Sequence, residues 1–270
     1  MPFSVLMSLY AKENPAYLRE SLDSVFRQTM PADEVVLVED GPLTPELYAV
    51  LDEYGRRFPA LKRVPLAENG GLGRALNEGL RHCSHDVVAR MDTDDVCFPE
   101  RFEKQVAFMQ EHPEVDICSS WIEEFEGSPE NVKSVKKVPA THREISRYIK
   151  KRSPLNHPAV MFRKKAVLDA GGYRHFWLFE DWYLWARMMA AGAIFANLQE
   201  PLLHFRTSPD MFRRRGGFRY AASSARLQWT FYKLGIVSLP GALWSSLLRG
   251  TVYVLPNRLR AFIYTKFLRS

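Results

Sequence analysis

Cysteine is scarce in this sequence, and the three present, Cys83, Cys97 and Cys118, lie far apart. Because they form no Cys-x-x-Cys pair, they argue against a disulfide framework or a zinc ribbon and fit a reducing compartment. Long hydrophobic runs are also missing. The longest uncharged stretch, 234–248, is interrupted by Gly and Pro and is shorter than the roughly 20 apolar residues of a membrane span. No basic segment precedes the first apolar run, as a signal peptide would require. We therefore expect a cytoplasmic protein.

Acidic residues are absent from the last quarter of the chain. Residues 211–270 contain eleven Lys or Arg and no Asp or Glu, whereas the other 210 residues carry 26 basic and 31 acidic side chains. This asymmetry predicts an anionic partner for the C-terminal region. Its cations are interleaved with aromatic residues and leucines and form no nucleic-acid-binding motif. A membrane surface or a lipid-linked phosphate therefore suits it better than nucleic acid, the alternative being a solvated basic face over a helical core.

The arrangement of apolar residues predicts an α/β fold. In the first 110 residues, short apolar runs alternate with amphipathic stretches, which is typical of a mostly parallel sheet with crossover helices. Strands are expected at 4–9, 34–39, 61–66, 86–91, 115–125, 132–138, 158–163 and 202–205. Helices are expected at 17–28, 45–58, 71–83, 99–110 and 180–191, and again beyond residue 210, including 239–254 and 258–268. We infer an α/β domain at 1–210 and a basic, amphipathic helical extension at 211–270.

Carboxylates follow two of the expected strands at the edge where open α/β sheets bind ligands. Asp40 follows the second strand, and Asp92, Asp94 and Asp95 follow the fourth. Three acids in four positions repel one another unless a cation lies among them. Mg²⁺ and Mn²⁺ prefer oxygen ligands and keep positions open for a diphosphate. The cluster therefore predicts a metal site. A helix cap or a turn is the competing explanation, strongest for Asp95.

Two other segments contain residues that could take part in binding or catalysis. The loop 69–74, Asn-Gly-Gly-Leu-Gly-Arg, is a candidate phosphate loop at the start of a helix, or a tight turn with Arg74 in solvent. Glu180 and Asp181 lie between Phe179 and Trp182, where an apolar pocket would raise a carboxyl pKa toward general-base duty; a helix cap is the alternative. His157 and His204 are single histidines without a second ligand at metal spacing, a pattern more typical of structural residues.

Six segments, taken together and in this order, resemble the family 2 glycosyltransferases of the GT-A fold. They are 4–10, 38–41, 69–77, 91–95, 156–158 and 179–185, so the resemblance covers about the first 210 residues. It implies a Rossmann-like, mostly parallel sheet flanked by helices and an inverting, metal-dependent transfer from a nucleotide sugar, with a UDP-hexose such as UDP-galactose as the expected donor. The expected acceptor is a lipid-diphosphate-linked glycan of bacterial surface polysaccharide synthesis, at the inner face of the cell membrane.

The resemblance also implies roles for individual residues. The expected nucleotide-sugar contacts are Tyr10, Glu13, Asp40, Arg74, Asp92 and Thr93. Asp94, with Asp92, is expected to hold Mn²⁺ or Mg²⁺, which bridges the diphosphate. Asp181 is expected to be the catalytic base, with Glu180 as the alternate. The residues expected near the acceptor or a diphosphate are His157, His204, Arg206, Arg213, Arg214 and Arg215. Ala11, Glu39 and Tyr183 depart from residues common in the family, and these departures weaken any inference about the donor.

Three other functions compete with this hypothesis. A phosphatase that uses Asp-x-Asp would have that motif after its first strand, whereas here it follows the fourth. A dinucleotide-dependent oxidoreductase needs a glycine fingerprint after the first strand, and the turn 10–14 contains no glycine. A non-catalytic membrane-associated scaffold would account for the C-terminal charge but leaves the aspartates unexplained.

Overall fold

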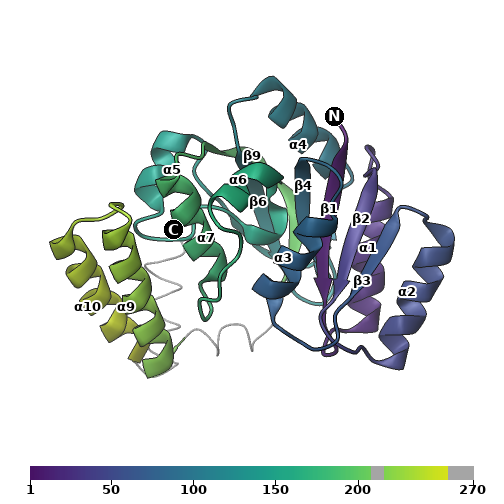
Figure 1. The fold of residues 1–270 in the computed structure, drawn as a ribbon, viewed down its shortest axis with the longest axis horizontal. Helices are drawn as coiled ribbons and strands as arrows, with labels where there is room; N and C mark the ends of the chain where they lie inside the picture. Colours follow the sequence, from purple (N-terminus) through teal and green to yellow (C-terminus); the bar gives the residue numbers. More distant parts are fainter. Residues whose placement is uncertain (208–215, 255–270) are drawn as a thin grey trace.

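A single mixed β-sheet organises the computed structural model, which describes residues 1–207 and 216–254 (Figure 1). Its strands lie in the order β3-β2-β1-β4-β8-β6-β9-β5, and β7 pairs with β6 outside this path. The strands are β1 Phe3–Leu9, β2 Glu34–Glu39, β3 Leu61–Pro65, β4 Val87–Asp92, β5 Val96–Cys97, β6 Ile117–Phe125, β7 Val132–Lys136, β8 Met161–Arg163 and β9 Phe195–Arg206. The helices are α1 Pro15–Phe26, α2 Pro45–Arg57, α3 Leu72–His82, α4 Arg101–Glu111, α5 His142–Tyr148, the 3₁₀ turn η1 His157–Ala159, α6 Lys164–Asp169, α7 Glu180–Ala190, α9 Phe218–Lys233 and α10 Leu239–Val254.

The first four strands form the parallel half of the sheet, as the sequence predicted. β1 lies between β2 and β4 and is parallel to both, and β2 is parallel to β3. Leu9 is level with Glu39, and Ser8 is level with Asp92. The carboxyl ends of β2 and β4 therefore reach the same edge of the sheet, with only β1 between them. This register brings Asp40 and the aspartate cluster to one side of the molecule.

Two apolar cores cover the two faces of the sheet. One contains residues of α1, α2 and α4, and the other contains residues of α3, α5, α6, α7 and α9. In α3, Gly79 faces the sheet so closely that a Cβ there would lie 2.3 Å from Leu6 Cδ1 and 2.7 Å from Val38 Cγ2. Because Gly79 has no side chain, α3 packs closely against Leu6 of β1 and Val38 of β2. This close packing sets where the loop at the start of α3 stands at the sheet edge.

The second half of the sheet contains four antiparallel pairings and differs from the expectation in several places. β8 runs antiparallel to β4 and to β6, and β9 runs parallel to β6. The expected strand at 202–205 begins at Phe195, because residues 195–198 also pair with β6, before an irregularity at 199–200 where the register shifts. The expected strand at 158–163 is divided, since Pro158 and Ala159 belong to the turn η1 and only Met161–Arg163 forms a strand. Helix α5 was not expected, although Thr141 and Glu144 form a capping box at its start.

Helices α9 and α10 confirm that the C-terminal region is helical as far as the structure describes it; 255–270 and the expected helix at 258–268 lie outside the described residues. The two helices pack together at the end of the molecule opposite α2 (Figure 1). Tyr220 of α9 lies 4.9 Å from Phe179, and Phe231 lies 5.6 Å from Trp182, between ring centroids. α9 thus packs directly on the start of α7, and the boundary at residue 210 stays a prediction. Among the described residues, no helix combines the length and apolarity that crossing a membrane needs.

Candidate active site

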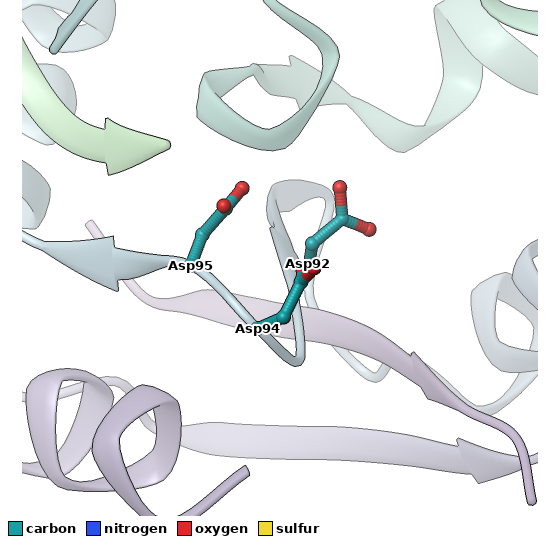
Figure 2. A group of neighbouring side chains, drawn as sticks. All are labelled: Asp92, Asp94 and Asp95. Atoms are coloured by element: carbon teal, nitrogen blue, oxygen red, sulfur yellow. The ribbon is translucent and has the colours of Figure 1, made fainter. Parts of the chain in front are cut away.

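The aspartates after β4 form a compact cluster. Asp92, Asp94 and Asp95 each place a carboxylate oxygen within 4.8 Å of the others. Figure 2 shows the three side chains on the turn between β4 and β5, with the carboxylates of Asp92 and Asp95 projecting to the same side. Asp95 does not cap α4, whose N-cap is Glu100. The helix-cap explanation for Asp95 is therefore wrong, and Asp95 joins Asp92 and Asp94, the two ligands named from the sequence, as a third candidate ligand.

Burial makes this cluster costly without a counterion. Asp95 is fully buried; one carboxylate oxygen accepts the Arg206 backbone N–H at 2.8 Å, and the other has no hydrogen-bond partner. Burial, with the neighbouring charges of Asp94 and Asp92, raises the Asp95 pKa well above its ordinary value. Burial, then Asp92 and Glu13, raises the pKa of Asp94 to about 7. An unpartnered buried oxygen beside two further carboxylates fits a hard divalent cation such as Mn²⁺ or Mg²⁺.

A buried arginine orients the first aspartate. Arg90, in β4, is 1% exposed, and its Nη1 donates to Asp92 Oδ2 at 2.8 Å while Nη2 donates to Oδ1. Ser21 Oγ also donates to the Asp92 carbonyl at 3.0 Å. This paired geometry fixes the plane of the carboxylate. The sequence analysis missed Arg90, whose only signal is a charged residue inside an otherwise apolar strand.

Arg206 holds the other side of the aspartate turn. Its Nε donates to the Asp94 carbonyl at 2.8 Å, Nη1 donates to the Gly127 carbonyl at 2.8 Å, and Nη2 donates to the Glu20 carboxylate. The guanidinium also lies 3.8 Å from the centroid of the Tyr17 ring. Arg206 thus connects the end of β9 to the turn. Its expected contact with a diphosphate stays a prediction, since each of its three nitrogens already donates within the chain.

Replacing Arg206 with lysine is expected to weaken Mn²⁺ binding about tenfold. Lysine keeps the charge but cannot donate hydrogen bonds in three fixed directions, so the turn that carries Asp94 and Asp95 is held less firmly. Calorimetric titration of the metal-free protein with Mn²⁺ measures the change. Arg219→Lys, an exposed arginine on α9, is the matched control. Unchanged Mn²⁺ affinity in Arg206→Lys would contradict a bracing role and favour direct contact with a ligand.

Asp40 anchors the glycine loop at the start of α3. Its buried carboxylate accepts hydrogen bonds from the backbone N–H groups of Gly70 at 2.7 Å and Gly71 at 3.0 Å, and from Asn69 Nδ2 at 3.0 Å. Gly41 has φ +85°, and a Cβ there would lie 2.6 Å from the Asn69 nitrogen. The sequence Asp40-Gly41 thus permits close passage of two loops. The expected contact of Asp40 with a nucleoside base stays a prediction.

The loop after β1 joins the aspartate turn. Glu13 Oε2 accepts a hydrogen bond from Thr93 Oγ1 at 3.2 Å, and burial raises the Glu13 pKa. Tyr10 stands at the beginning of this loop and is 42% exposed. The structure therefore brings Tyr10, Glu13, Thr93 and the aspartates to the same sheet edge. Their expected contacts with a nucleotide stay predictions.

A cavity of about 400 Å³ extends from the glycine loop to the start of α7. Its lining includes Arg74, Asn77, Tyr173 and Glu180. The half-exposed guanidinium of Arg74 pairs with Glu68 at 2.9 Å. Asn77 fixes the far wall, because its Nδ2 donates to the Tyr173 carbonyl and its Oδ1 accepts the Tyr173 N–H, both at 2.7 Å. The cavity thus connects the expected donor loop to the expected base region.

Glu180 and Asp181 begin α7, and neither caps it, since the N-cap is Phe179 and makes no side-chain hydrogen bond. Glu180 pairs with His175 at 3.2 Å, and burial raises the Glu180 pKa. Asp181 Oδ2 accepts a hydrogen bond from Ser153 Oγ at 3.3 Å. Burial raises the pKa of the Tyr173 hydroxyl, and the charges of Asp181, Asp92 and Glu180 also act on it. The two acidic motifs, distant in sequence, therefore both act electrostatically on the Tyr173 hydroxyl.

The histidines are held by packing. His157 Nε2 lies 2.9 Å from the Tyr173 hydroxyl, and burial, with the Arg90 charge, holds the His157 pKa well below its ordinary value. His204 stacks on Phe98 at 4.1 Å, and its Nδ1 lies 3.2 Å from Glu123; burial lowers its pKa. His157 thus belongs to the wall around Tyr173. Contact of either histidine with an acceptor stays a prediction, and Arg213, Arg214 and Arg215 lie outside the described residues.

Known proteins resemble this chain over most of its length. A family model described as Glycosyl transferase family 2 matches residues 4–172. An Escherichia coli protein named UDP-Gal:alpha-D-GlcNAc-diphosphoundecaprenol beta-1,3-galactosyltransferase is 42% identical over 267 residues, which cover 99% of this chain and 96% of that protein. The Amylovoran biosynthesis glycosyltransferase AmsE of Erwinia amylovora is 41% identical over 272 residues, covering 98% of each chain.

Solved structures share the fold. S. aureus TarS 1–349, in a complex with UDP-GlcNAc, superposes with a TM-score of 0.67 at 20% identity, covering 98% of this chain and 74% of that one. A mannosyltransferase from Pyrobaculum calidifontis, in a complex with GDP-Man and Mn²⁺, gives a TM-score of 0.66 at 16% identity, covering 99% and 81%. At these identities the likeness concerns the fold alone.

Proposed function

The chain belongs to glycosyl transferase family 2, and we propose that it transfers galactose from UDP-galactose to a glycan carried on a lipid diphosphate. The family match confirms the resemblance drawn from the six sequence segments, and the chain is a glycosyltransferase with the GT-A fold. The scaffold, oxidoreductase and phosphatase hypotheses are therefore wrong. One observation carries the proposed chemistry: three carboxylates, one with an unpartnered buried oxygen, meet at the ligand-binding edge of the sheet.

The aspartate turn is the proposed metal centre. Asp94 and Asp92, joined by Asp95, would hold Mn²⁺ or Mg²⁺ through carboxylate oxygens. When bound, the ion offsets the negative charge on the departing nucleoside diphosphate. Arg90 and Arg206 keep the turn in place from two sides. Tyr10, Glu13, Thr93 and Asp40, at the same edge, would bind the nucleoside, and Arg74, across the cavity, would approach the phosphates.

The start of α7 supplies the proposed base. Asp181 takes the proton of the acceptor hydroxyl as that oxygen bonds to the anomeric carbon of the donor sugar. The bond between that carbon and the diphosphate oxygen breaks on the opposite side, so the configuration inverts, as in inverting hydrolysis with an acceptor hydroxyl in place of water. The burial of Glu180 and its place in the cavity wall keep it as the alternate base.

The donor and acceptor are proposed from sequence identity. The Escherichia coli relative is named for UDP-Gal and for a GlcNAc-diphosphoundecaprenol acceptor. At 42% identity over nearly the whole of both chains, a UDP-hexose and a lipid-diphosphate-linked glycan are the best-supported substrates. An acceptor with a polyprenyl chain resides in a membrane, so we place the enzyme at the cytoplasmic face of the cell membrane, in the synthesis of a bacterial surface polysaccharide.

A donor comparison tests the proposal. The enzyme is incubated with Mn²⁺, a GlcNAc-diphosphate carrying a short alkyl chain, and one of UDP-galactose, UDP-glucose, UDP-GlcNAc or GDP-mannose. Mass spectrometry is expected to show one added hexose with UDP-galactose and little product with the others. Transfer from the GDP sugar alone, or from none of the four, would contradict the proposed donor.

A further inference from the structure

Helix α10 presents an apolar stripe to solvent. Leu243, Trp244, Leu247 and Leu248 are 60%, 66%, 62% and 55% exposed. Their spacing of one and four residues places them on one face of the helix. Single exposed leucines are ordinary on protein surfaces, whereas a contiguous apolar patch marks a surface that another body covers. We call these four residues the α10 stripe.

The opposite face of α10 fixes the helix to the protein. Arg249 donates to the Lys151 carbonyl and to the Tyr253 hydroxyl, the latter at 3.2 Å, and its guanidinium lies 5.2 Å from the centroid of the Trp182 ring. Tyr253 is buried and lies 4.6 Å from Tyr220, between ring centroids. At 100° per residue, Arg249 and Tyr253 point away from the α10 stripe. The stripe therefore faces outward because the other side of the helix is already bound.

The two C-terminal helices, and the turn to which α10 is bound, carry charge of one sign. The described residues of α9 and α10 include Arg219, Arg226, Lys233 and Arg249 and no acid. The turn that Arg249 contacts adds Lys150, Lys151 and Arg152. A second copy of the chain would bring cations against cations, which opposes association through this face. Lipid headgroups with negative charge attract it, and the stripe can enter the headgroup boundary.

We propose that α10 docks on an anionic bilayer, with the α10 stripe in the interface and the cations of α9, α10 and the turn 150–152 adding electrostatic attraction to the headgroups. Docking would also place the candidate base close to the membrane; this part of the inference rests on the proposed function. Arg249 donates a hydrogen bond to the Lys151 carbonyl and lies over the Trp182 ring. Asp181 directly precedes Trp182 in the chain and accepts a hydrogen bond from Ser153. Docking through α10 therefore holds the start of α7 beside the membrane, where a lipid-linked acceptor is presented.

Sedimentation of the full-length chain with vesicles tests the proposal. Vesicles of phosphatidylcholine alone are compared with vesicles of equal parts phosphatidylcholine and phosphatidylglycerol. The wild type is expected to bind the anionic vesicles and to lose binding as salt is raised. The double substitution Trp244→Gln with Leu247→Gln is expected to lower the partition coefficient about tenfold or more. Its control is Val132→Gln with Val135→Gln, which removes two exposed apolar side chains of β7.

The outcomes separate docking from catalysis. A wild type that stays in the supernatant at low salt, or a stripe variant that binds like the control, overturns the proposal. A second result also overturns it: light scattering shows a wild-type dimer that the stripe substitutions dissociate, while vesicle binding is unchanged. In that case a second copy of the chain covers the stripe. Transfer to the short-chain, water-soluble acceptor should be equal in the stripe variant and the wild type. If the wild type binds vesicles but transfers no sugar, the proposed function fails while docking stands.

Discussion

Replacing Asp94 with alanine is expected to lower the rate of sugar transfer about 10³-fold or more. A divalent ion contributes several kcal/mol of charge stabilisation at a departing diphosphate, and each 1.36 kcal/mol is a factor of about ten in rate. Asp94 is one of three carboxylates that lie within 4.8 Å of one another. Its loss removes a ligand and misplaces the ion that remains. The measurement is the initial rate at saturating donor and Mn²⁺.

A stability measurement separates this loss from unfolding. Burial and the neighbouring acids Asp92 and Glu13 raise the pKa of Asp94 to about 7, so its charge is unfavourable in the metal-free protein. The melting temperature of Asp94→Ala without metal should therefore be equal to that of the wild type or higher. Glu100→Ala, an exposed acid five residues after the cluster, is the control and should keep full activity. Near-normal turnover of Asp94→Ala in the presence of a chelator would show that the metal assignment is wrong.

Replacing Asp181 with asparagine is expected to lower kcat by about 10²-fold to 10⁴-fold while donor affinity is kept. Asparagine has nearly the same size and still accepts a hydrogen bond from Ser153, but it does not take up the acceptor proton. Rates at saturating donor, with UDP affinity from calorimetry, separate the two effects. Loss of donor affinity at an unchanged rate would indicate a structural residue at the start of α7.

Glu180→Gln is the matched comparison, because Glu180 precedes Asp181 on the same helical turn. Glu180 lines the cavity and forms an ion pair with His175, whereas Asp181 accepts a hydrogen bond from Ser153. If Asp181 is the base, Glu180→Gln should cause the smaller fall in kcat. A larger defect in Glu180→Gln than in Asp181→Asn would reverse the assignment.

Sequence patterns were sufficient for the parallel half of the fold. Strands β1, β2 and β4 are short, mostly apolar runs with a clear turn after each, and their local signals agree with their tertiary positions. β9 was only partly predicted, because Gln199, Glu200 and Pro201 interrupt its apolar pattern at the place where its pairing with β6 shifts register. Pro158 and Ala159 were assigned to a strand because an apolar run by itself does not show that its first residues form a helical turn. Helix α5 had a readable signal in Thr141 and Glu144 that was not used.

The candidate site was predicted as a set of acids, but its supporting residues were not. Asp92 and Asp94 were recognised in the sequence because they follow an apolar run that predicts a strand. Arg206 and Asn77 act through hydrogen bonds to residues that are near only in the folded chain: Arg206 is 112 residues from Asp94, and Asn77 is 96 residues from Tyr173. Sequence separation of that size leaves no local pattern. The α10 stripe, in contrast, is visible as helical spacing, although only the structure shows which face is already bound.

The anomeric configuration of the product tests the central claim most directly. UDP-galactose, in which the sugar is α-linked, is incubated with the enzyme, Mn²⁺ and the short-chain GlcNAc-diphosphate acceptor, and the purified product is examined by proton NMR. Attack by the acceptor hydroxyl opposite the departing diphosphate, with one carboxylate as base, predicts a single β-linked galactose. An α-linked galactose, or free galactose with no transfer to the acceptor, would contradict the account.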